Sequence, residues 1–449
     1  MPPTTDHQRD PASAPRLLVV SYHLPSAETV AASRPAALAA FAVEQGWDVR
    51  ILTASNQSAD AAGVPPGRVI QAAPSPQLPR PGRRAEVSRV GDPVRRASSL
   101  ARLRAGANRS LTRAGLELLV PDPQVNWIRP ALRAFRAADG DWRPDVVLAS
   151  APPFSGFLVA AAIARRLGVP WVADYRDLWS VGNDYWVRSS LRRAVDEKLE
   201  RRVLRSVTAC VTVSSPLAET LRRTFGVDAR VVMNGIDRRR VTPRSADARP
   251  VPGGPGGVTL TLAYTGHLYG GRRDPGPLLA ALALLGQDAG RVHVVFAGED
   301  NGVVRAAADR AGVSDCVTVL GYVSPEKSWQ IQADADVLVQ LMWNDPRDAG
   351  TVTGKMFDYL QARRPILLLG YEDGVAARLV RDRGAGVVSN EPAAIAAQLL
   401  EWLAVKQRTG ALPAVPASAL DGLLREDQFK PYLQLLREAA DGSVRAARD

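Results

Sequence analysis

The stretch DAGTVTGKMFDYLQARRPIL, which begins at Asp348, carries the residue types that bind an anion at the start of a helix. Gly350 and Gly354 would let backbone N–H groups approach an oxyanion closely, and one of the two neighbouring threonines is an expected N-cap. The N-terminus of a helix carries roughly half a positive charge, and Lys355 adds a full one. This spacing predicts a phosphate or diphosphate site that works without a metal.

Asp358 follows one turn into the same predicted helix. A carboxylate there could accept hydrogen bonds from the two hydroxyls of a sugar diol. The local pattern fits a well-capped helix with a surface acid equally well, so both interpretations stay open at this point.

A second candidate phosphate site lies in YTGHLYGGRRDPGPLL, after the first predicted strand of the second half. Gly266 opens a glycine-rich turn, and Arg272 and Arg273 supply guanidinium groups that suit phosphate. Asp274 before a proline predicts the start of a helix. Neither stretch has the pattern GxxxxGK[ST], and GxGxxG does not follow the first strand, so ATP hydrolysis and ordinary dinucleotide binding lose support.

Polar residues also follow four predicted strands of the first half. They are His23, the turn SAPPFS at 150–155, the segment DYRDLW at 174–179 and NGID at 234–237. One such cluster is often only a turn, but four at one edge of a parallel sheet indicate a pocket. Three aromatic residues there fit either stacking on a sugar or lipid acceptor or local packing: Trp179, Tyr185 and Trp186.

Apolar runs and helical patterns alternate along the chain, which predicts parallel sheets with helices on both faces and thus an α/β fold. In the first half we expect strands at 16–21, 48–54, 144–150, 170–175, 207–215 and 229–235, with helices at 34–46, 155–168, 191–206 and 216–226. In the second half we expect strands at 258–266, 292–298, 317–321, 336–342, 365–370 and 385–389, with helices beginning near Pro275, Gly302, Pro325, Thr353, Gly374 and Glu391.

The length of 449 residues predicts two or three domains, and 46% hydrophobic with 23% charged residues is an ordinary globular balance. We expect a disordered tail at 1–15, a first Rossmann-like domain at 16–240 with a basic insertion at about 60–120, and a linker at 241–257. A second Rossmann-like domain would cover 258–425. A final helical part is expected at 426–449, and its return to the first domain stays open at this point.

The net charge of +11 is concentrated in one segment, Arg68–Arg113, which has eleven arginines and only two acids. Three interpretations stay open: a patch for anionic membranes, a merely solvated insertion, or a nucleic-acid site. The segment has no interleaved aromatics, which counts against single-stranded nucleic acid.

Cys210 and Cys316 lie in separate halves, so we expect no structural disulfide and a reducing compartment. No zinc spacing is present, and we interpret DAD at 334–336 as a helix–strand junction, not a metal site. No apolar run approaches the ~20 residues that span a bilayer. The polar, proline-rich start does not resemble a signal peptide. We therefore expect a cytoplasmic protein, with any membrane contact peripheral at the inner face.

The ordered set of motifs resembles glycosyltransferase family 4, of the GT-B fold, over about residues 16–435. The branch with DFRDLW-like motifs, common in exopolysaccharide and natural-product gene clusters, is the most similar. The motifs are SYHLPS with SRP, PDVVLASAPPFSG, GVPWVADYRDLW, VTVSSPLAETL, VVMNGID, YTGHLYGGRRDPGPLL and GKMFDYLQARRPIL.

This resemblance implies two doubly wound Rossmann-like domains facing a cleft, and a retaining, metal-independent transferase that uses a nucleotide-diphosphate sugar. The second domain would bind the donor and the first the acceptor. The family's arginine and lysine for the diphosphate fall on His267 and Arg272. Of two family glutamates, the ribose-binding one matches Asp358, and the other matches Gly350, so a side chain that the family has near the donor sugar is missing here.

The family histidine near the reacting sugar is replaced by Arg176, between Asp174 and Asp177. Attack on the same face of the sugar needs no dedicated base, and the resemblance implies no cofactor beyond the co-substrate. The candidate catalytic residues are Arg176, Asp174 and Asp177; the diphosphate site is Gly266, His267, Arg272, Arg273, Thr353, Gly354 and Lys355; the ribose site is Asp358; the base site is Tyr322 and Val323; the acceptor side is His23, Arg34, Ser150, Trp179 and Asn234.

Two rivals remain on the same fold. A nucleotide-sugar epimerase needs catalytic acids and a histidine, which His267 could supply. A non-catalytic sugar-nucleotide binding protein is suggested by Gly350, and it would bind nucleotide without turnover.

Overall fold

The computed structural model describes residues 14–24, 33–55, 63–75, 118–138, 140–182, 189–238, 260–268, 272–299 and 302–443. Most of the expected tail, most of the basic insertion, the linker at 241–257 and the aromatic pair Tyr185 and Trp186 lie outside these residues. The chain forms two compact units. The first unit comprises Met1–Thr212, Ala218–Arg230 and Tyr432–Asp449, and the second comprises Val213–Leu217 and Val231–Pro431.

The first unit is built on a sheet whose described strands run in the order β3-β2-β1-β4-β5-β6-β7. Every strand pair with a described register is parallel. The strands are β1 (Arg16–Val20), β2 (Asp48–Ala54), β3 (Val69–Ala72), β4 (Val146–Ala151), β5 (Trp171–Tyr175), β6 (Ala209–Thr212) and β7 (Ala229–Val231).

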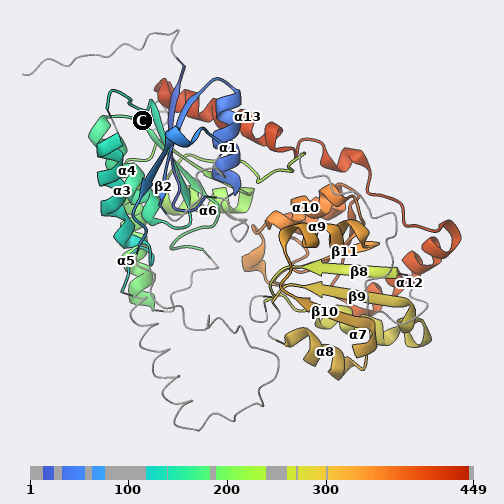
Figure 1. Ribbon diagram of the computed structural model, residues 1–449. Coiled ribbons are helices and arrows are strands. Elements are labelled where there is room, and N and C mark those ends of the chain that lie inside the picture. Colours follow the sequence, from blue (N-terminus) through green and yellow to red (C-terminus); the bar gives the residue numbers. More distant parts are fainter. Residues whose placement is uncertain are drawn as a thin grey trace, which may run out of the picture. The chain divides into compact units, whose positions relative to one another are not determined.

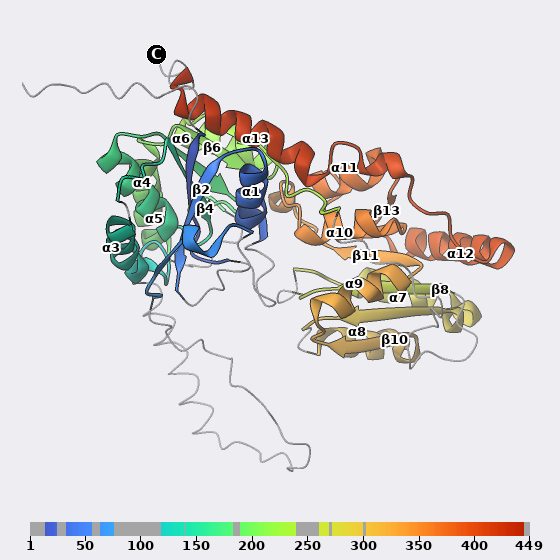
Figure 2. The same ribbon diagram turned by 45° about the horizontal axis from the view of Figure 1, so that its top comes forward.

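Helices cover both faces of this sheet. They are α1 (Ser33–Glu44), α3 (Ile128–Ala138), α4 (Ser155–Leu167), α5 (Ser190–Leu204) and α6 (Ser215–Phe225), with 3-10 turns η3 (Pro66–Arg68) and η4 (Val125–Trp127). Helices α3, α4 and α5 lie on one face and α1 lies on the other (Figures 1 and 2). Between the sheet and α3–α4 lies an apolar core with large aromatic side chains, among them Trp127, Phe157 and Trp171.

The second unit has a parallel sheet whose described strands follow the order β10-β9-β8-β11-β12-β13. The strands are β8 (Leu260–Thr265), β9 (Val292–Ala297), β10 (Val317–Gly321), β11 (Val337–Leu341), β12 (Ile366–Leu369) and β13 (Gly386–Val388). The helices are α7 (Gly276–Leu284), α8 (Val303–Ala311), α9 (Pro325–Asp334), α10 (Gly354–Ala362), α11 (Val375–Asp382), α12 (Pro392–Thr409) and α13 (Arg425–Ala440), with 3-10 turns η5 (Gly286–Arg291), η6 (Ser314–Cys316), η7 (Pro346–Asp348) and η8 (Ala417–Leu420).

Two apolar clusters, one on each face of the second sheet, hold this unit together. Helices α7, α8 and α12 supply one cluster, and α9, α10 and α11 supply the other (Figure 1). Strands β8, β9 and β11 are buried along their whole length, which explains their continuous apolar runs. The expected fold class, two doubly wound Rossmann-like domains, is confirmed.

Helix α13 is divided between the two units. Its residues up to Pro431 belong to the second unit, and those from Tyr432 onward belong to the first. Its last turns are fixed there by an ion pair of Glu438 with Arg230, at 2.9 Å, and by Arg437 over the ring of Trp47. The first unit is therefore discontinuous in sequence.

Most predicted strands and helices are present to within a few residues, but β3 and α3 were not predicted. Strand β3 has only four residues and lies in the region taken as an insertion. Helix α3 has apolar residues at helical spacing, Ile128, Leu132 and Phe135, with arginines on its other face; this pattern indicates an amphipathic helix but was missed. Both cysteines are free and buried, one in each unit. Among the described helices, none combines the length and apolarity needed to cross a membrane.

Candidate active site

Two glycines bring the carboxyl ends of β8 and β9 into close contact. Gly266 has φ +138° and donates its N–H to Ala297 O at 2.6 Å, while Gly298 has φ +136° and donates to Gly321 O at 2.7 Å. A Cβ on Gly298 would lie 2.3 Å from the carbonyl oxygen of Gly266. Only glycine tolerates both the backbone conformation and this approach, so the edge of the sheet presents bare backbone.

The ammonium group of Lys355 lies at this edge. Its Nζ is 4.3 Å from the ring centre of Tyr264 and 2.1 Å from the position that a Cβ on Gly266 would take. The nitrogen is buried and has no hydrogen-bond partner among the described residues. Burial holds the pKa of Lys355 well below its usual value, and Arg273 lowers it further, against the opposing effect of Asp358. A buried ammonium without an acceptor is unfavourable, so this position favours an anionic ligand.

The start of α10 lies next to Lys355 in the sequence. Thr353 occupies the N-cap position, but its hydroxyl makes no cap hydrogen bond and accepts one from Gln340 Nε2 at 3.3 Å. The hydroxyl of Thr351 donates to Asp348 at 2.7 Å. The expectation that a threonine side chain caps this helix is therefore wrong, because both hydroxyls are engaged elsewhere. The first N–H groups of α10 keep no side-chain cap, as an anion site requires.

Tyr359 fixes α10 to the end of β8. Its buried hydroxyl accepts a hydrogen bond from the backbone N–H of Thr265 at 3.0 Å, and Gln332 donates to the Thr265 hydroxyl at 2.9 Å. Because Lys355 and Asp358 lie on the same short helix, these contacts set their position relative to Gly266.

The backbone of His267 is held from two sides. Its carbonyl oxygen accepts hydrogen bonds from the Tyr264 hydroxyl at 2.7 Å and from Arg273 Nη1 at 3.0 Å. Its exposed imidazole lies 3.8 Å from the Glu299 carboxylate. A helix starts here as predicted, although Pro275 and not Asp274 is its N-cap residue, and Asp274 accepts a hydrogen bond from Gly276 N at 2.8 Å. The structure thus brings Gly266, His267, Arg273 and Lys355 together.

Trp343, two residues after β11, was missed in the sequence. The Cζ of Arg272 lies 4.6 Å from its ring centre and that of Arg347 lies 4.3 Å from it, both as cation–π contacts. Asp345 pairs with Arg347 at 2.7 Å, and the pKa of Asp345 falls to about 2 because of hydrogen bonds from Arg347, with a further effect of Arg272. Trp343 therefore holds Arg272. A tryptophan just after a buried strand was the available signal.

In the first unit, Asp174 lies at the carboxyl end of β5, opposite Ser150 of β4. Its carboxylate is 1% exposed, accepts from Ser150 Oγ at 2.8 Å, and pairs with Arg34 at 3.1 Å. The ring centre of Tyr432 lies 5.5 Å from the Arg34 guanidinium. The three predicted residues Arg34, Ser150 and Asp174 are thus in contact, but as a buried network that fits a positioning role.

Arg176 directs its guanidinium at the neighbouring strand end. It donates to the carbonyl of Ala151 at 3.2 Å and to that of Pro152. Burial lowers the pKa of Arg176, while Asp177 and Asp174 oppose that shift. Asp177 is exposed. His23 lies after β1, with its carbonyl bonded to the Ser21 hydroxyl at 2.7 Å and its ring edge-on to Tyr22.

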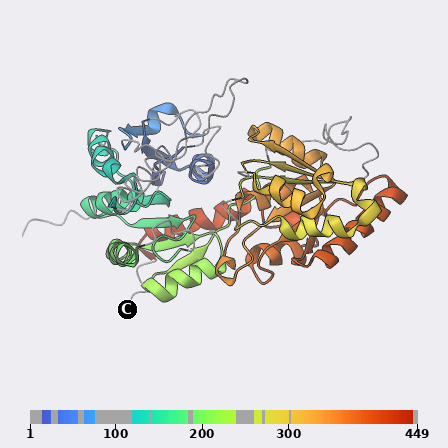
Figure 3. The same ribbon diagram turned by 90° about the horizontal axis from the view of Figure 1, so that it is seen from below.

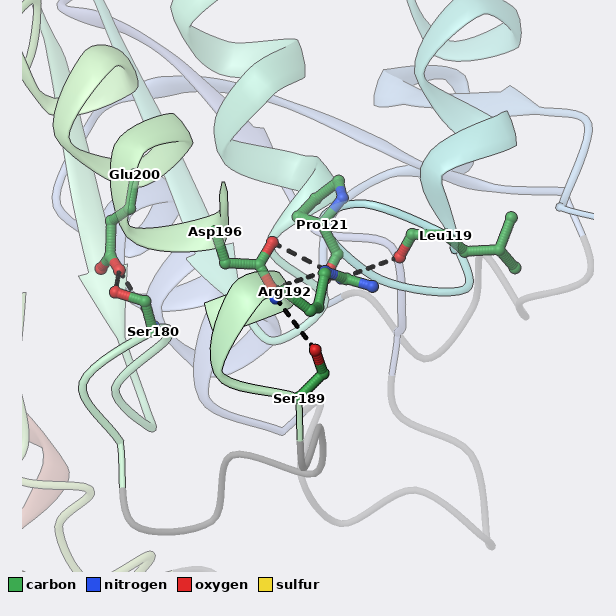
Figure 4. A network of polar contacts seen from close by, with 7 residues as sticks. All are labelled: Leu119, Pro121, Ser180, Ser189, Arg192, Asp196 and Glu200. Atoms are coloured by element: carbon green, nitrogen blue, oxygen red, sulfur yellow. Dashed lines mark hydrogen bonds and ion pairs between the residues drawn. The ribbon is translucent and has the colours of Figure 1, made fainter. Parts of the chain in front are cut away.

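A buried polar stripe on α5 supports this edge (Figure 4). Glu200 accepts from the Tyr175 hydroxyl at 2.8 Å and from Ser180 N at 3.0 Å, and so fixes both ends of the segment that carries Arg176. Burial raises the pKa of Glu200 to about 7. Arg192 pairs with Asp196 at 2.9 Å and donates to the carbonyls of residues 119 and 121, both at 3.0 Å.

Comparison with protein families gives the class. Residues 30–235 match the model described as "Glycosyl transferase 4-like domain", and residues 259–404 match "Glycosyl transferases group 1". Together the two matches span most of the chain.

The chain belongs to the glycosyltransferases. No curated protein sequence matches it.

Solved structures show the same fold. The glycosyltransferase of Rickettsia africae ESF-5 is 10% identical, with a TM-score of 0.59, covering 95% of this chain and 98% of that one. Sucrose-phosphate synthase of Thermosynechococcus elongatus is 14% identical, with a TM-score of 0.57 and coverage of 97% and 98%. Anabaena Alr3699/HepE, solved with UDP and glucose, is 14% identical, with a TM-score of 0.59 and coverage of 94% and 99%. At these identities the likeness establishes the fold alone.

Gly350 of the glycosyltransferase is tightly packed. Its carbonyl accepts from the Ser214 hydroxyl at 2.6 Å, and a Cβ on it would lie 2.9 Å from Leu217 Cδ2. Residues 213–217 cluster with the second unit. A longer side chain at this position, which the resemblance aligned with a family glutamate, would have to displace the end of the Leu217 side chain.

Two predicted residues of the glycosyltransferase lie elsewhere than expected. Trp179 is 1% exposed and stacks on Phe154 with ring centres 5.2 Å apart, so it packs in the core and does not face an acceptor. Asn234 belongs to the second unit, where the adjoining Ile236 pairs with Leu424. The predicted strand at 229–235 is shorter, since β7 ends at Val231, and NGID instead lies against the residues before α13.

Three further predicted positions of the glycosyltransferase lie at the ends of strands in the second unit. Tyr322 is 65% exposed and follows β10, with Val323 partly buried beside it. Asp336 is buried, accepts from Thr261 N at 2.9 Å and pairs with Lys406 at 2.5 Å. The DAD motif thus carries a structural acid at the start of β11.

Proposed function

We propose that this glycosyltransferase moves a sugar from a nucleotide-diphosphate sugar to an acceptor, with retention and without a metal, in polysaccharide, glycolipid or natural-product biosynthesis. The observation that carries the proposal is the buried, unpartnered ammonium of Lys355 beside Gly266. Two phosphates carry the negative charge that this position favours.

The donor would lie along the carboxyl edge of the second sheet. Lys355, the first N–H groups of α10, Arg272 and Arg273 would bind the diphosphate, and Asp358 the ribose diol. Tyr322 and Val323 would border the base. The Anabaena structures with UDP and with UDP-glucose support a donor of this class on this fold.

The chemistry follows from charge. The bond from the sugar's anomeric carbon to the phosphate oxygen breaks while a bond to the acceptor oxygen forms on the same face. The acceptor's proton passes to the departing phosphate oxygen. Preorganised cations and helix N–H groups would stabilise the charge on the leaving diphosphate. Arg176 and Asp177 are candidates to contact the reacting sugar, and Asp174, which is near them in the chain, is held by Arg34 and Ser150.

Mass spectrometry of a nucleotide-sugar panel, with lipid and soluble acceptors, tests this function. We expect a glycosylated acceptor and a nucleoside diphosphate, and we expect turnover to survive EDTA. Activity that disappears in EDTA and returns with Mn²⁺ would overturn the metal-free mechanism.

An assay without acceptor distinguishes the proposed transferase from an epimerase and from a non-catalytic binding protein. The His267–Glu299 contact, at 3.8 Å, keeps an epimerase as the second candidate. An epimerase would convert the sugar nucleotide without any acceptor, and a binding protein would retain nucleotide without turnover in any mixture. We further propose that the segment Arg68–Arg113 favours a membrane-bound acceptor, because of its charge.

A further inference from the structure

A cavity of about 350 Å³ lies between α3 and α4 in the first unit. The two helices pack side by side on one face of the sheet, as the teal helices of Figures 1 and 3 show. The cavity is lined by four apolar residues and three arginines: Leu132, Phe135, Ala162, Ile163, Arg136, Arg165 and Arg166. We propose that this arginine-rimmed cavity binds an anionic phospholipid at a membrane surface.

The charge of the two helices that form the cavity is one-sided. Neither α3 nor α4 contains an acidic residue. The three rim arginines are exposed, as are Arg129 and Arg133 on α3, and none of these five side chains makes an ion pair or hydrogen bond among the described residues. Arginines in the last turn of a helix also interact with its dipole. That effect does not account for Arg129 and Arg133, or for the apolar lining.

An anionic phospholipid fits this combination of arginines and apolar lining better than a nucleic acid does. Guanidinium groups bind phosphate through paired hydrogen bonds, and the apolar lining from Leu132 to Ile163 can accept hydrocarbon. A nucleic acid offers phosphates but no hydrocarbon for that lining. The segment Arg68–Arg113, with a net charge of +9, precedes α3 in the sequence and strengthens the attraction to an anionic surface.

The cavity is separate from the proposed donor site. It lies in the first unit, whereas Lys355 and α10 lie in the second. Arg136, Arg165 and Arg166 are in the last turns of helices that lead into β4 and β5, so the cavity lies toward the edge where those strands begin. Ser150 and Arg176 lie toward the opposite edge. Lipid binding therefore does not depend on the proposed function.

Vesicle flotation of the full chain tests the proposal. The probes are vesicles of phosphatidylcholine alone and of phosphatidylcholine mixed with phosphatidylglycerol. The test variant combines Arg136→Gln, Arg165→Gln and Arg166→Gln. The control combines Arg202→Gln, Arg223→Gln and Arg310→Gln, which removes the same charge from exposed arginines elsewhere. Both variants keep the arginine-rich segment, and thermal melting verifies that both fold like the wild type.

We expect the wild type to float with anionic vesicles and not with neutral ones. Each basic residue at such a surface contributes about a fivefold change in partitioning, so the test variant should lose roughly a hundredfold. The control should keep most of the wild-type binding. A Leu132→Ala variant should bind more weakly at high salt, where hydrocarbon contact dominates.

Three results would overturn the proposal. The test variant could float like the wild type, or the control could lose as much as the test variant, which would make the effect one of total charge. The third is a chain that ignores both kinds of vesicle but binds duplex DNA, with a smaller salt dependence in the test variant.

Discussion

Gly266 and Lys355 share one small volume: the lysine Nζ lies 2.1 Å from where a Cβ on Gly266 would be. The glycine therefore determines where the ammonium can lie. Because Gly266 also has φ +138°, a side chain there is unfavourable on two grounds.

Gly266→Ala should displace the lysine side chain, because its far end is flexible, and weaken binding of an anion. We expect affinity for pyrophosphate, a probe that needs no knowledge of the base, to fall about tenfold or more. Calorimetry measures it. Gly290→Ala in η5 is the matched control, because a Cβ there meets nothing within 4 Å and the residue is not part of the proposed site. Equal losses in the two variants would contradict the assignment.

Lys355 should make both binding and stability depend on pH. Its pKa in the folded protein is depressed below 10.5 by burial. The unfolded chain thus binds the proton more readily, and the free energy of unfolding should rise with pH between the depressed pKa and about 10.5. Lys355→Met should flatten that rise in denaturant titrations.

An anion that pairs with Lys355 favours its protonated form, so pyrophosphate binding should take up a proton. Calorimetry in buffers of different ionisation enthalpy measures the uptake. Lys355→Arg, which stays charged, should lose this uptake and keep binding. Identical proton uptake in the wild type and the arginine variant would show that the lysine does not contact the ligand.

Substitutions of Asp358 and of Arg272 should affect the binding of the nucleoside part and of the phosphate part of the donor differently. A hydrogen bond to a charged group contributes roughly 1.5–3 kcal/mol, so Asp358→Ala should weaken nucleoside and nucleotide binding alike by about tenfold or more. Arg272→Ala should weaken only the phosphorylated ligand. Trp343→Leu should resemble Arg272→Ala, because the ring holds that guanidinium. If Asp358→Ala binds the corresponding nucleoside diphosphate as tightly as the wild type does, α10 is not part of the donor site.

Ionisation of the buried Glu200 carboxyl should lower the free energy of unfolding as the pH rises. Its pKa is about 7 in the folded protein, against 4.5 without burial, so the folded state binds more protons in that interval. The free energy of unfolding should therefore fall between about pH 4.5 and pH 7 and level off above, by up to about 3 kcal/mol. Glu200→Gln should abolish the slope in urea titrations at several pH values. A slope unchanged in Glu200→Gln would assign it to another group.

The sequence was a good guide where one pattern determines the structure. Strand β2 and strand β10 have the predicted bounds, because short apolar runs between turn residues have few other solutions. The arginine-bearing helix α3 was not predicted, although Ile128, Leu132 and Phe135 recur at helical spacing. The glycines and the lysine predicted a positive charge at the start of α10. They did not predict that the ammonium of Lys355 is buried against the ring of Tyr264 on β8.

Contacts between distant segments account for the other differences. Arg192, Asp196 and Glu200 recur every four residues on α5 and have the spacing of a solvent-exposed face, yet all three are buried. Arg192 pairs with Asp196 on the same helix, but the further partners of Arg192 and those of Glu200 come from 119–121 and 175–180, which no local pattern connects to the helix. Trp179 likewise packs on Phe154, a residue 25 positions earlier in the sequence.

The course of α13 has a practical consequence for anyone who exchanges domains between related enzymes. A cut in the segment between 238 and 260 would give an amino-terminal fragment that lacks Tyr432 beside Arg34 and lacks Glu438, the partner of Arg230. Such a fragment would expose the surface that the last helix covers and should be poorly soluble. A working chimera must carry the carboxyl-terminal turns with the amino-terminal domain, so two crossovers are needed, not one.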